Sequence, residues 1–88
     1  RSRGLGDVYK RQLEERMEEF MFLGLRLMEG VSGTEFFSRF GQNMWNVYGT
    51  VIERLEKQGL IEVEMPVIRL TEQGIDVSNR VLSQFLLD

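Results

Sequence analysis

The hydrophobic pattern of the chain changes its period at Gly59, and this change constrains the fold more than any other feature. Before Gly59, apolar residues recur at steps of three and four, the spacing of one helix face. After it, the stretch LIEVEM alternates with the two-residue period of a strand, with Ile61, Val63 and Met65 on one side. Pro66 interrupts this run, and VIRL follows. The sequence therefore predicts helices first and a short hairpin after them.

The first predicted helix spans about Leu13–Glu29 and is apolar on more than one side. Its stripe at helical spacing is widened by further apolar residues, so we expect other elements to cover it on two faces. Gly24 inside this helix costs about 1 kcal/mol relative to alanine, which favours a close approach of another backbone at this point. The stripe consists of Leu13, Met17, Phe20, Gly24, Leu27 and Met28, and the additional apolar residues are Phe22, Leu23 and Leu25.

Two more helices are predicted before the hairpin. Ser32 and Glu35 have the spacing of a capping box, flanked by Val31 and Phe36 as a hydrophobic staple. Gly41 supplies a left-handed end to this short helix. The third helix spans roughly Met44–Gln58, with Asn43 as its cap. Its predicted inward face holds Trp45, Tyr48, Val51, Ile52 and Leu55, and its outward face holds Asn46, Thr50, Glu53, Arg54, Glu56 and Lys57.

A last helix follows the hairpin, with Thr71 as its cap. Its predicted inward stripe is Ile75, Ser78, Leu82 and Phe85 or Leu86. The fold class expected from these elements is mainly α with a small β-hairpin, in the winged-helix-like order helix, helix, helix, hairpin, helix.

The first twelve residues do not resemble natural protein sequence. The stretch SRGLGDVYKRQ, residues 2–12, resembles a sequencing-library adapter translated in frame. We therefore predict that residues 1–12 are adapter-derived, that they take no part in the native fold, and that residues 13–88 form one truncated domain. The glycine pair in this stretch follows no strand, so it does not indicate a phosphate-binding loop.

The charge of the remaining chain argues against nucleic acid and membrane surfaces as partners. From Leu13 onward there are seven basic and thirteen acidic residues, a net charge of −6. Affinity for nucleic acid comes largely from lysine and arginine that neutralise phosphates. No apolar run approaches the roughly 18 residues of a membrane-spanning helix. Cysteine and histidine are both absent, which excludes disulfides, cysteine nucleophiles and histidine acid–base chemistry.

Of three possible sites, two have a more ordinary structural interpretation that we favour, and Arg26 is the exception. The aromatic residues could line a pocket for a planar ligand, with a methionine or tyrosine as axial haem ligand, but aromatics and methionines at helical spacing more often fill a small core. The acidic cluster Glu14, Glu15, Glu18 and Glu19 could bind a hard cation, but is better explained as a solvated first helical turn. Arg26 stands between apolar neighbours, where a cation needs a carboxylate or carbonyl partner. The aromatic residues concerned are Phe20, Phe22, Phe36, Phe37, Phe40, Trp45 and Tyr48, and the methionines are Met17, Met21, Met28, Met44 and Met65.

Several blocks of the chain resemble the C-terminal domain of radical SAM proteins related to oxygen-independent coproporphyrinogen III oxidase, and most closely their haem-chaperone branch. These blocks are EEFMFLGLRLMEGVS, FFSRFG, VYGTVIERLEKQGLIE and IRLTEQGIDVSNRVLSQFLL. Pro66 departs from the polar turn expected in the family. The resemblance implies a cytoplasmic parent whose N-terminal barrel domain, absent here, binds a 4Fe-4S cluster and S-adenosylmethionine and handles haem or a porphyrin.

By this resemblance the chain itself is a non-catalytic module with no cofactor-binding residue and no metal ligand. Its implied role is to pack on the barrel domain and to help shape the haem or porphyrin site. We expect Phe20, Arg26 and the wide apolar face of the first helix to form the interdomain docking surface. The resemblance leaves open whether the parent is an oxidase or a haem chaperone. The alternatives are a free-standing winged-helix DNA-binding regulator and a general protein-interaction domain.

Overall fold

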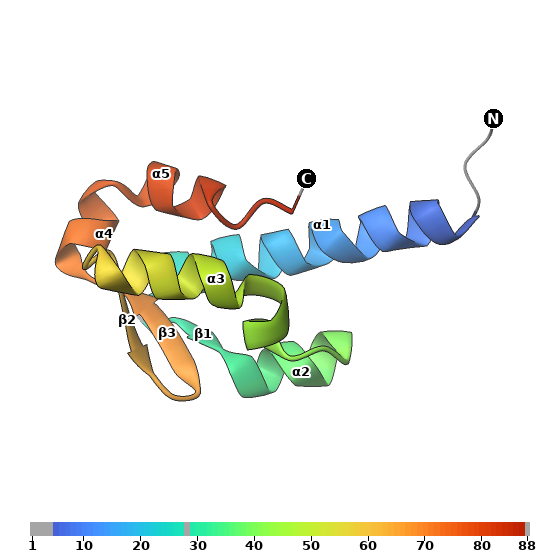
Figure 1. Ribbon diagram of the computed structural model, residues 1–88, viewed down its shortest axis with the longest axis horizontal. Helices are drawn as coiled ribbons and strands as arrows, with labels where there is room; N and C mark the ends of the chain where they lie inside the picture. Colours follow the sequence, from blue (N-terminus) through green and yellow to red (C-terminus); the bar gives the residue numbers. More distant parts are fainter. Residues whose placement is uncertain (1–4, 28, 88) are drawn as a thin grey trace.

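The computed structural model describes residues 5–27 and 29–87 and confirms the predicted fold class, mainly helical with a small antiparallel sheet. The predicted order of three helices, a hairpin and a C-terminal helical segment is present, and one short additional strand precedes the second helix (Figure 1). The elements are α1 (Leu5–Arg26), β1 (Val31–Ser32), α2 (Gly33–Phe40), α3 (Met44–Lys57), β2 (Ile61–Glu64), β3 (Val67–Leu70), α4 (Glu72–Asp76) and α5 (Ser78–Ser83).

The sheet has three antiparallel strands in the order β1-β3-β2. Ile68 is its central residue, because it pairs with Val31 on one side and with Val63 on the other. The turn into β1 depends on Gly30, whose φ of 83° lies in the left-handed region. A Cβ at this position would collide with the carbonyl oxygen of Ile68. The extra strand therefore ties the end of α1 to the predicted hairpin.

The predicted helix caps are confirmed. The Ser32 hydroxyl accepts a hydrogen bond from the Glu35 N–H at 3.3 Å, and the Asn43 side chain accepts one from the Trp45 N–H at 2.8 Å. Gly41 ends α2 with a φ of 69°. The Thr71 hydroxyl does more than cap α4: it accepts from the Gly74 N–H at 3.0 Å and donates to the Gly59 carbonyl at 2.6 Å. This residue thus joins the start of the hairpin to its end.

The core lies where α1, α2, α3, the sheet and the C-terminal segment from α5 onward converge. Four aromatic rings form a chain of edge-to-face contacts through it. The ring centroids are 5.7 Å apart for Phe20 and Phe36, 6.2 Å for Phe36 and Tyr48, and 5.1 Å for Tyr48 and Phe85. The predicted inward face of α3 is confirmed for Tyr48, Ile52 and Leu55, and its predicted outward residues are all exposed. The buried apolar residues are Met17, Met21, Leu25, Val31, Phe36, Met44, Tyr48, Ile52, Leu55, Leu60, Ile61, Ile68, Val81, Leu82 and Phe85.

The first helix differs from its predicted bounds at both ends. It begins at Leu5 rather than near Leu13 and ends at Arg26 rather than Glu29. It begins earlier because the stretch before Leu13 has helical residues that continue the same run, and it ends earlier because the chain must turn into β1. Figure 1 shows the N-terminal turns of α1 projecting beyond the other elements. Among the described residues, the hydrophobic core and its partly buried margin begin at Leu13.

The last predicted helix is two helices, broken at Val77, whose φ and ψ are −120° and 35°. The break changes the phase of the helical stripe, so the inward prediction for Ile75 is wrong: its side chain is 55% exposed. Leu82 and Phe85 are buried as predicted, and Val81 joins them. Leu86 is exposed, so Phe85 rather than Leu86 is the inward residue at the end of the predicted stripe.

Candidate docking site

A groove of about 620 Å³ lies between α1 and α2, and we call it the α1–α2 groove. Leu23 and Leu27 are 58% and 57% exposed on α1 and on the bend after it, although α1 already contacts α2, β1, β3 and α5. The groove therefore exposes apolar surface that no described element covers. It is lined by Arg16, Glu19, Phe20, Leu23, Gly24, Leu27, Glu29, Gly30, Val31, Glu35, Arg39 and Phe40.

Gly24 allows the floor of the groove to form. A Cβ at this position would lie 2.5 Å from Cγ2 of Val31 and 3.5 Å from the Gly30 carbonyl oxygen. The prediction that Gly24 permits a close approach is confirmed, and the neighbour is β1 with the turn before it. A larger residue would push the strand away from α1 and change the groove.

Phe20 belongs both to the core and to the α1–α2 groove. Its ring is half-buried and meets Phe36 and Phe40 edge to face at 5.7 and 5.6 Å. The guanidinium carbon of Arg39 lies 5.4 Å from the centre of the same ring, and Arg39 also pairs with Glu35 at 3.2 Å. These contacts hold the ring in one position at the edge of the groove.

Arg26 lies in the last turn of α1, is exposed and does not line the α1–α2 groove. Within residues 5–27 and 29–87 its side chain forms no ion pair, so the partner expected for it is not found in the described chain. The structure therefore does not bring Phe20 and Arg26 into one site. At the C-terminal end of a helix, the charge of Arg26 complements the helix dipole.

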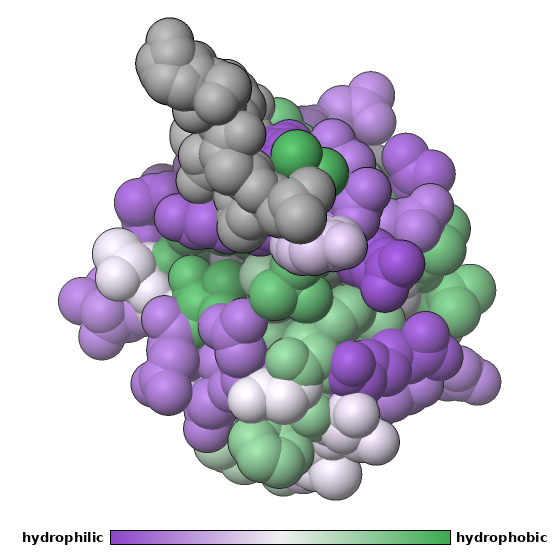
Figure 2. Space-filling model, turned by 90° about the vertical axis from the view of Figure 1, so that its right-hand side faces the viewer, coloured by the Kyte–Doolittle hydropathy of each residue, from purple (hydrophilic) through white to green (hydrophobic). Residues whose placement is uncertain are grey.

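Figure 2 shows the end of the molecule toward which α1 projects. Hydrophobic residues gather over the lower part of this face, where α2 lies in Figure 1, and hydrophilic residues surround them. Phe37 of α2 is 58% exposed. The exposed apolar surface of the domain thus extends onto α2.

The interpretation of the aromatic and methionine residues as core is confirmed for most of them. Phe36, Tyr48, Met17, Met21 and Met44 are buried. Phe37 and Met65 are the exceptions, with exposures of 58% and 71%, and Met28 lies outside the described residues. The partly buried Phe20, Phe22, Phe40 and Trp45 pack against the core.

Tyr48 has a buried hydroxyl oxygen with no hydrogen-bond partner among the described residues. Burial raises the pKa of this hydroxyl well above its usual range, and the charges of Glu18 and Glu14 raise it further. The hydroxyl is therefore a neutral, unpaired group in the core rather than a ligand on the surface.

The acidic cluster of α1 is not a solvated first turn, because the helix begins eight or more residues earlier and Glu18 is 5% exposed. The Glu18 carboxylate accepts a hydrogen bond from the Leu87 N–H at 2.8 Å and lies 3.6 Å from the Arg11 guanidinium. Arg11 also pairs with Glu14 and Glu15 at 3.1 and 3.5 Å. Among the described residues, no group of three or more acidic side chains could hold a metal ion. Glu18 instead anchors the C-terminal segment to α1.

The hairpin of β2 and β3 contains one cationic residue, Arg69, and two glutamates neutralise it. Arg69 of β3 donates to Glu62 at 3.2 Å and to Glu64 at 2.7 Å, and these hydrogen bonds raise the pKa of its guanidinium. The exposed side of α3 offers Arg54 and Lys57 beside Glu53 and Glu56. No basic stripe of the kind that binds DNA backbone lies on these elements. None of the helices described in residues 5–27 and 29–87 is long and apolar enough to cross a membrane.

The radical SAM cluster implied by the family resemblance does not fit this chain. Three thiolates would be needed, and the chain has no cysteine and no histidine.

Comparison with known proteins identifies the family. Residues 12–77 match the profile of the HemN C-terminal domain. The chain is 36% identical over 80 residues to the heme chaperone HemW of Bacillus subtilis (strain 168), covering 91% of this chain and 21% of that protein. It is 36% identical over 75 residues to the heme chaperone HemW of Lactococcus lactis subsp. lactis (strain IL1403), covering 85% of this chain and 20% of that protein. The chain thus spans about a fifth of the length of these relatives. No solved structure matches it significantly. Because the family profile matches most of its length, this mainly helical chain with a small sheet belongs to the HemN C-terminal domain family.

Proposed function

We propose that this chain is the C-terminal domain of a haem chaperone of the radical SAM type, and that it packs through the α1–α2 groove on the upstream domain of the same protein. In this position it helps to shape the site where the parent handles haem. The domain itself is non-catalytic.

The observation that carries the proposal is the exposed apolar surface at Leu23 of α1 and at Leu27 just after it, although α2, β1, β3 and α5 already contact this helix. Burying a leucine side chain completely is worth about 1.5–3 kcal/mol, so covering the exposed part of each of these two would contribute about 1–2 kcal/mol. Isolated domains rarely leave such surface uncovered when they act alone.

We take the upstream part of the parent to be the occupant of the groove, because the relatives are much longer than this chain. Relatives that match nearly the whole chain are about four times as long as it, so most of each relative lies outside the matched region. A domain of this size buries only about 60% of the surface of its unfolded chain and gains stability from a larger neighbour. Phe20 would present its fixed ring edge at this interface, and Arg26 would meet a carboxylate or carbonyl of the upstream domain at the margin.

The test compares interface variants of the full-length parent. Leu23→Glu and Leu27→Glu together place two charges in the groove, and Ile75→Glu is the matched control, since Ile75 is similarly exposed but lies on α4. We expect the double variant to separate thermal unfolding of the two domains, to speed proteolytic cleavage between them and to weaken haem retention. Ile75→Glu is expected to do none of these.

The same substitutions in the 88-residue chain should leave its circular dichroism unchanged, because both leucines are exposed there. A full-length double variant that unfolds and binds haem as the unaltered protein does would refute the docking proposal. Arg26→Gln is expected to give a smaller change in the same direction.

A further inference from the structure

A second groove, of about 410 Å³, lies between α3 and α5, and we call it the α3–α5 groove. Its floor is apolar, formed by Leu55, Leu60 and Val81, which are all buried. Its rim is polar, formed by Gln58, Arg80 and Gln84. It is distinct from the proposed docking surface, and nothing in the proposed function uses it.

The charge at this groove is opposite to that of the chain. The chain has a formal net charge of −3, yet the α3–α5 groove has no acidic residue in its lining. The α1–α2 groove, by contrast, is lined by Glu19, Glu29 and Glu35. An arginine at the rim of an apolar floor, without acidic neighbours in the lining, is an arrangement suited to an incoming anion.

Arg54 is held at the same groove by a hydrogen bond. Its guanidinium donates to Oε1 of Gln84 at 2.9 Å, which fixes the fork of Arg54 against a residue of the lining. With its oxygen engaged by Arg54, Gln84 has its amide N–H groups left to donate. Within the described part of the chain, neither Arg54 nor Arg80 forms an ion pair. Glu53 and Glu56 of α3 are exposed and do not line the groove.

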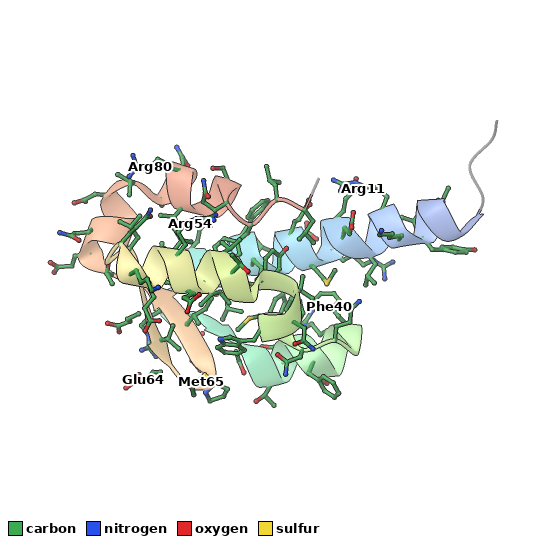
Figure 3. All side chains as sticks on the ribbon, in the orientation of Figure 1. Arg11, Phe40, Arg54, Glu64, Met65 and Arg80 are labelled. Atoms are coloured by element: carbon green, nitrogen blue, oxygen red, sulfur yellow. The ribbon has the colours of Figure 1, made fainter. Side chains whose placement is uncertain are left out.

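Figure 3 places Arg54 and Arg80 on the side of the molecule where α3 and α5 lie, toward the end occupied by α4. They lie far along the long axis from Phe40, which lines the α1–α2 groove, and above Glu64 and Met65 at the tip of the hairpin. A partner bound here would leave the α1–α2 groove free for the upstream domain.

We propose that the α3–α5 groove binds an acidic peptide segment of a partner protein, with a carboxylate between Arg54 and Arg80 and an adjacent apolar side chain on the floor. Guanidinium groups recognise carboxylates through paired N–H donors, and the amides of Gln58 and Gln84 add further donors. The floor of Leu55, Leu60 and Val81 favours an acidic residue with apolar neighbours over a bare anion.

The test uses the 88-residue chain labelled with ¹⁵N and the peptide acetyl-Leu-Glu-Leu-Glu-Leu-amide as probe. We expect the peptide to shift the side-chain amide signals of Gln58 and Gln84, and binding to weaken as salt is added. Because exposed ion pairs are weak, Arg54→Gln and Arg80→Gln should each reduce the affinity by about fivefold or less, but measurably. Arg16→Gln, the same charge change on α1, should leave the affinity unaltered.

Any of the following results would overturn the proposal. The first is equal binding of the same peptide with glutamine in place of glutamate, which would make the contact purely apolar. The second is an equal loss of affinity in Arg16→Gln, or the absence of any shift at Gln58 and Gln84. The third is stronger binding of inorganic phosphate than of the peptide at the same signals, which would make this a phosphate site. Loss of the docking function in the full-length parent would not affect any of these outcomes.

Discussion

Replacing Tyr48 by phenylalanine should stabilise the domain, although it removes a polar group from a residue in the centre of the core. The Tyr48 hydroxyl is buried and has no hydrogen-bond partner among the described residues, while the ring itself contacts Phe36 and Phe85. Burying an unpaired hydroxyl costs about 1–3 kcal/mol by mutational data. Tyr48→Phe keeps both ring contacts and removes this cost. Some packing around the lost oxygen is forfeited, so we expect a net gain of about 1 kcal/mol in the free energy of unfolding.

The pH dependence supplies a second, independent signature. The pKa of Tyr48 in the folded chain lies well above its ordinary value of 10.0, because of burial first and the charges of Glu18 and Glu14 second. Above pH 10 the unfolded chain loses this proton and the folded chain keeps it. The unfolded state then binds fewer protons, so the free energy of unfolding falls as pH rises, by up to about 1.4 kcal/mol per pH unit. Tyr48→Phe removes this contribution, so its advantage should grow above pH 10.

Urea denaturation of both proteins at pH 7 and at several values above pH 10 measures both effects. Tyr9, which both proteins contain, cancels from the comparison. Tyr48→Ala is the control for the ring, and should cost about 3–5 kcal/mol because it leaves a cavity in the core. A loss of 1 kcal/mol or more in Tyr48→Phe at pH 7, where we predict a gain of about that size, would mean that the hydroxyl has a stabilising partner, and the reasoning would be refuted.

Two further substitutions test the turns that join the elements, each measured by urea denaturation. Thr71→Val removes both hydrogen bonds of the hydroxyl and should cost about 2 kcal/mol, whereas Thr71→Ser keeps them and should stay within about 0.5 kcal/mol. Gly30→Ala puts a side chain at positive φ against the Ile68 carbonyl and should cost at least about 2 kcal/mol. Its control, Gly49→Ala, has open space inside α3 and should stabilise by about 0.5–1 kcal/mol, and equal effects at the two glycines would contradict the geometry.

Local signals in the sequence were sufficient for the starts of α2, α3 and α4 and for the hairpin, but not for the start of α1. Ser32, Asn43 and Thr71 act as caps within a few residues of the groups they bind, so their role can be predicted from spacing alone. Strand β1 could not be predicted in this way. It is two residues long, too short to show a period, and it exists only because Val31 and Ser32 pair with β3 more than thirty residues later.

Glu18 shows the same limit for a charged residue. Its place among four glutamates suggested a solvated turn, but its burial depends on a hydrogen bond from Leu87, 69 residues away in the sequence. The prediction for Ile75 was wrong for a different reason. One continuous helix was assumed, but the helix is broken at Val77 into α4 and α5. The apolar stripe of a helix can be extrapolated only as far as the helix is continuous. Beyond the break the inward face is different, so Ile75 is exposed and Val81 is buried.

The candidate docking site combines a part that sequence could predict and a part that it could not. The excess of apolar residues on α1 was predictable, since the apolar stripe in the sequence is wider than one helix face. Which residues would remain exposed was not, because α2, β1, β3 and α5 all compete for the same helix. Leu25 is buried in the core, whereas Leu23 and Leu27 are exposed. Gly24 allows β1 to pack against α1 close to these two leucines. The surface offered to a partner is therefore set by where β1 lies, and a substitution at Gly24 should alter docking by displacing β1, with Leu23 and Leu27 unchanged.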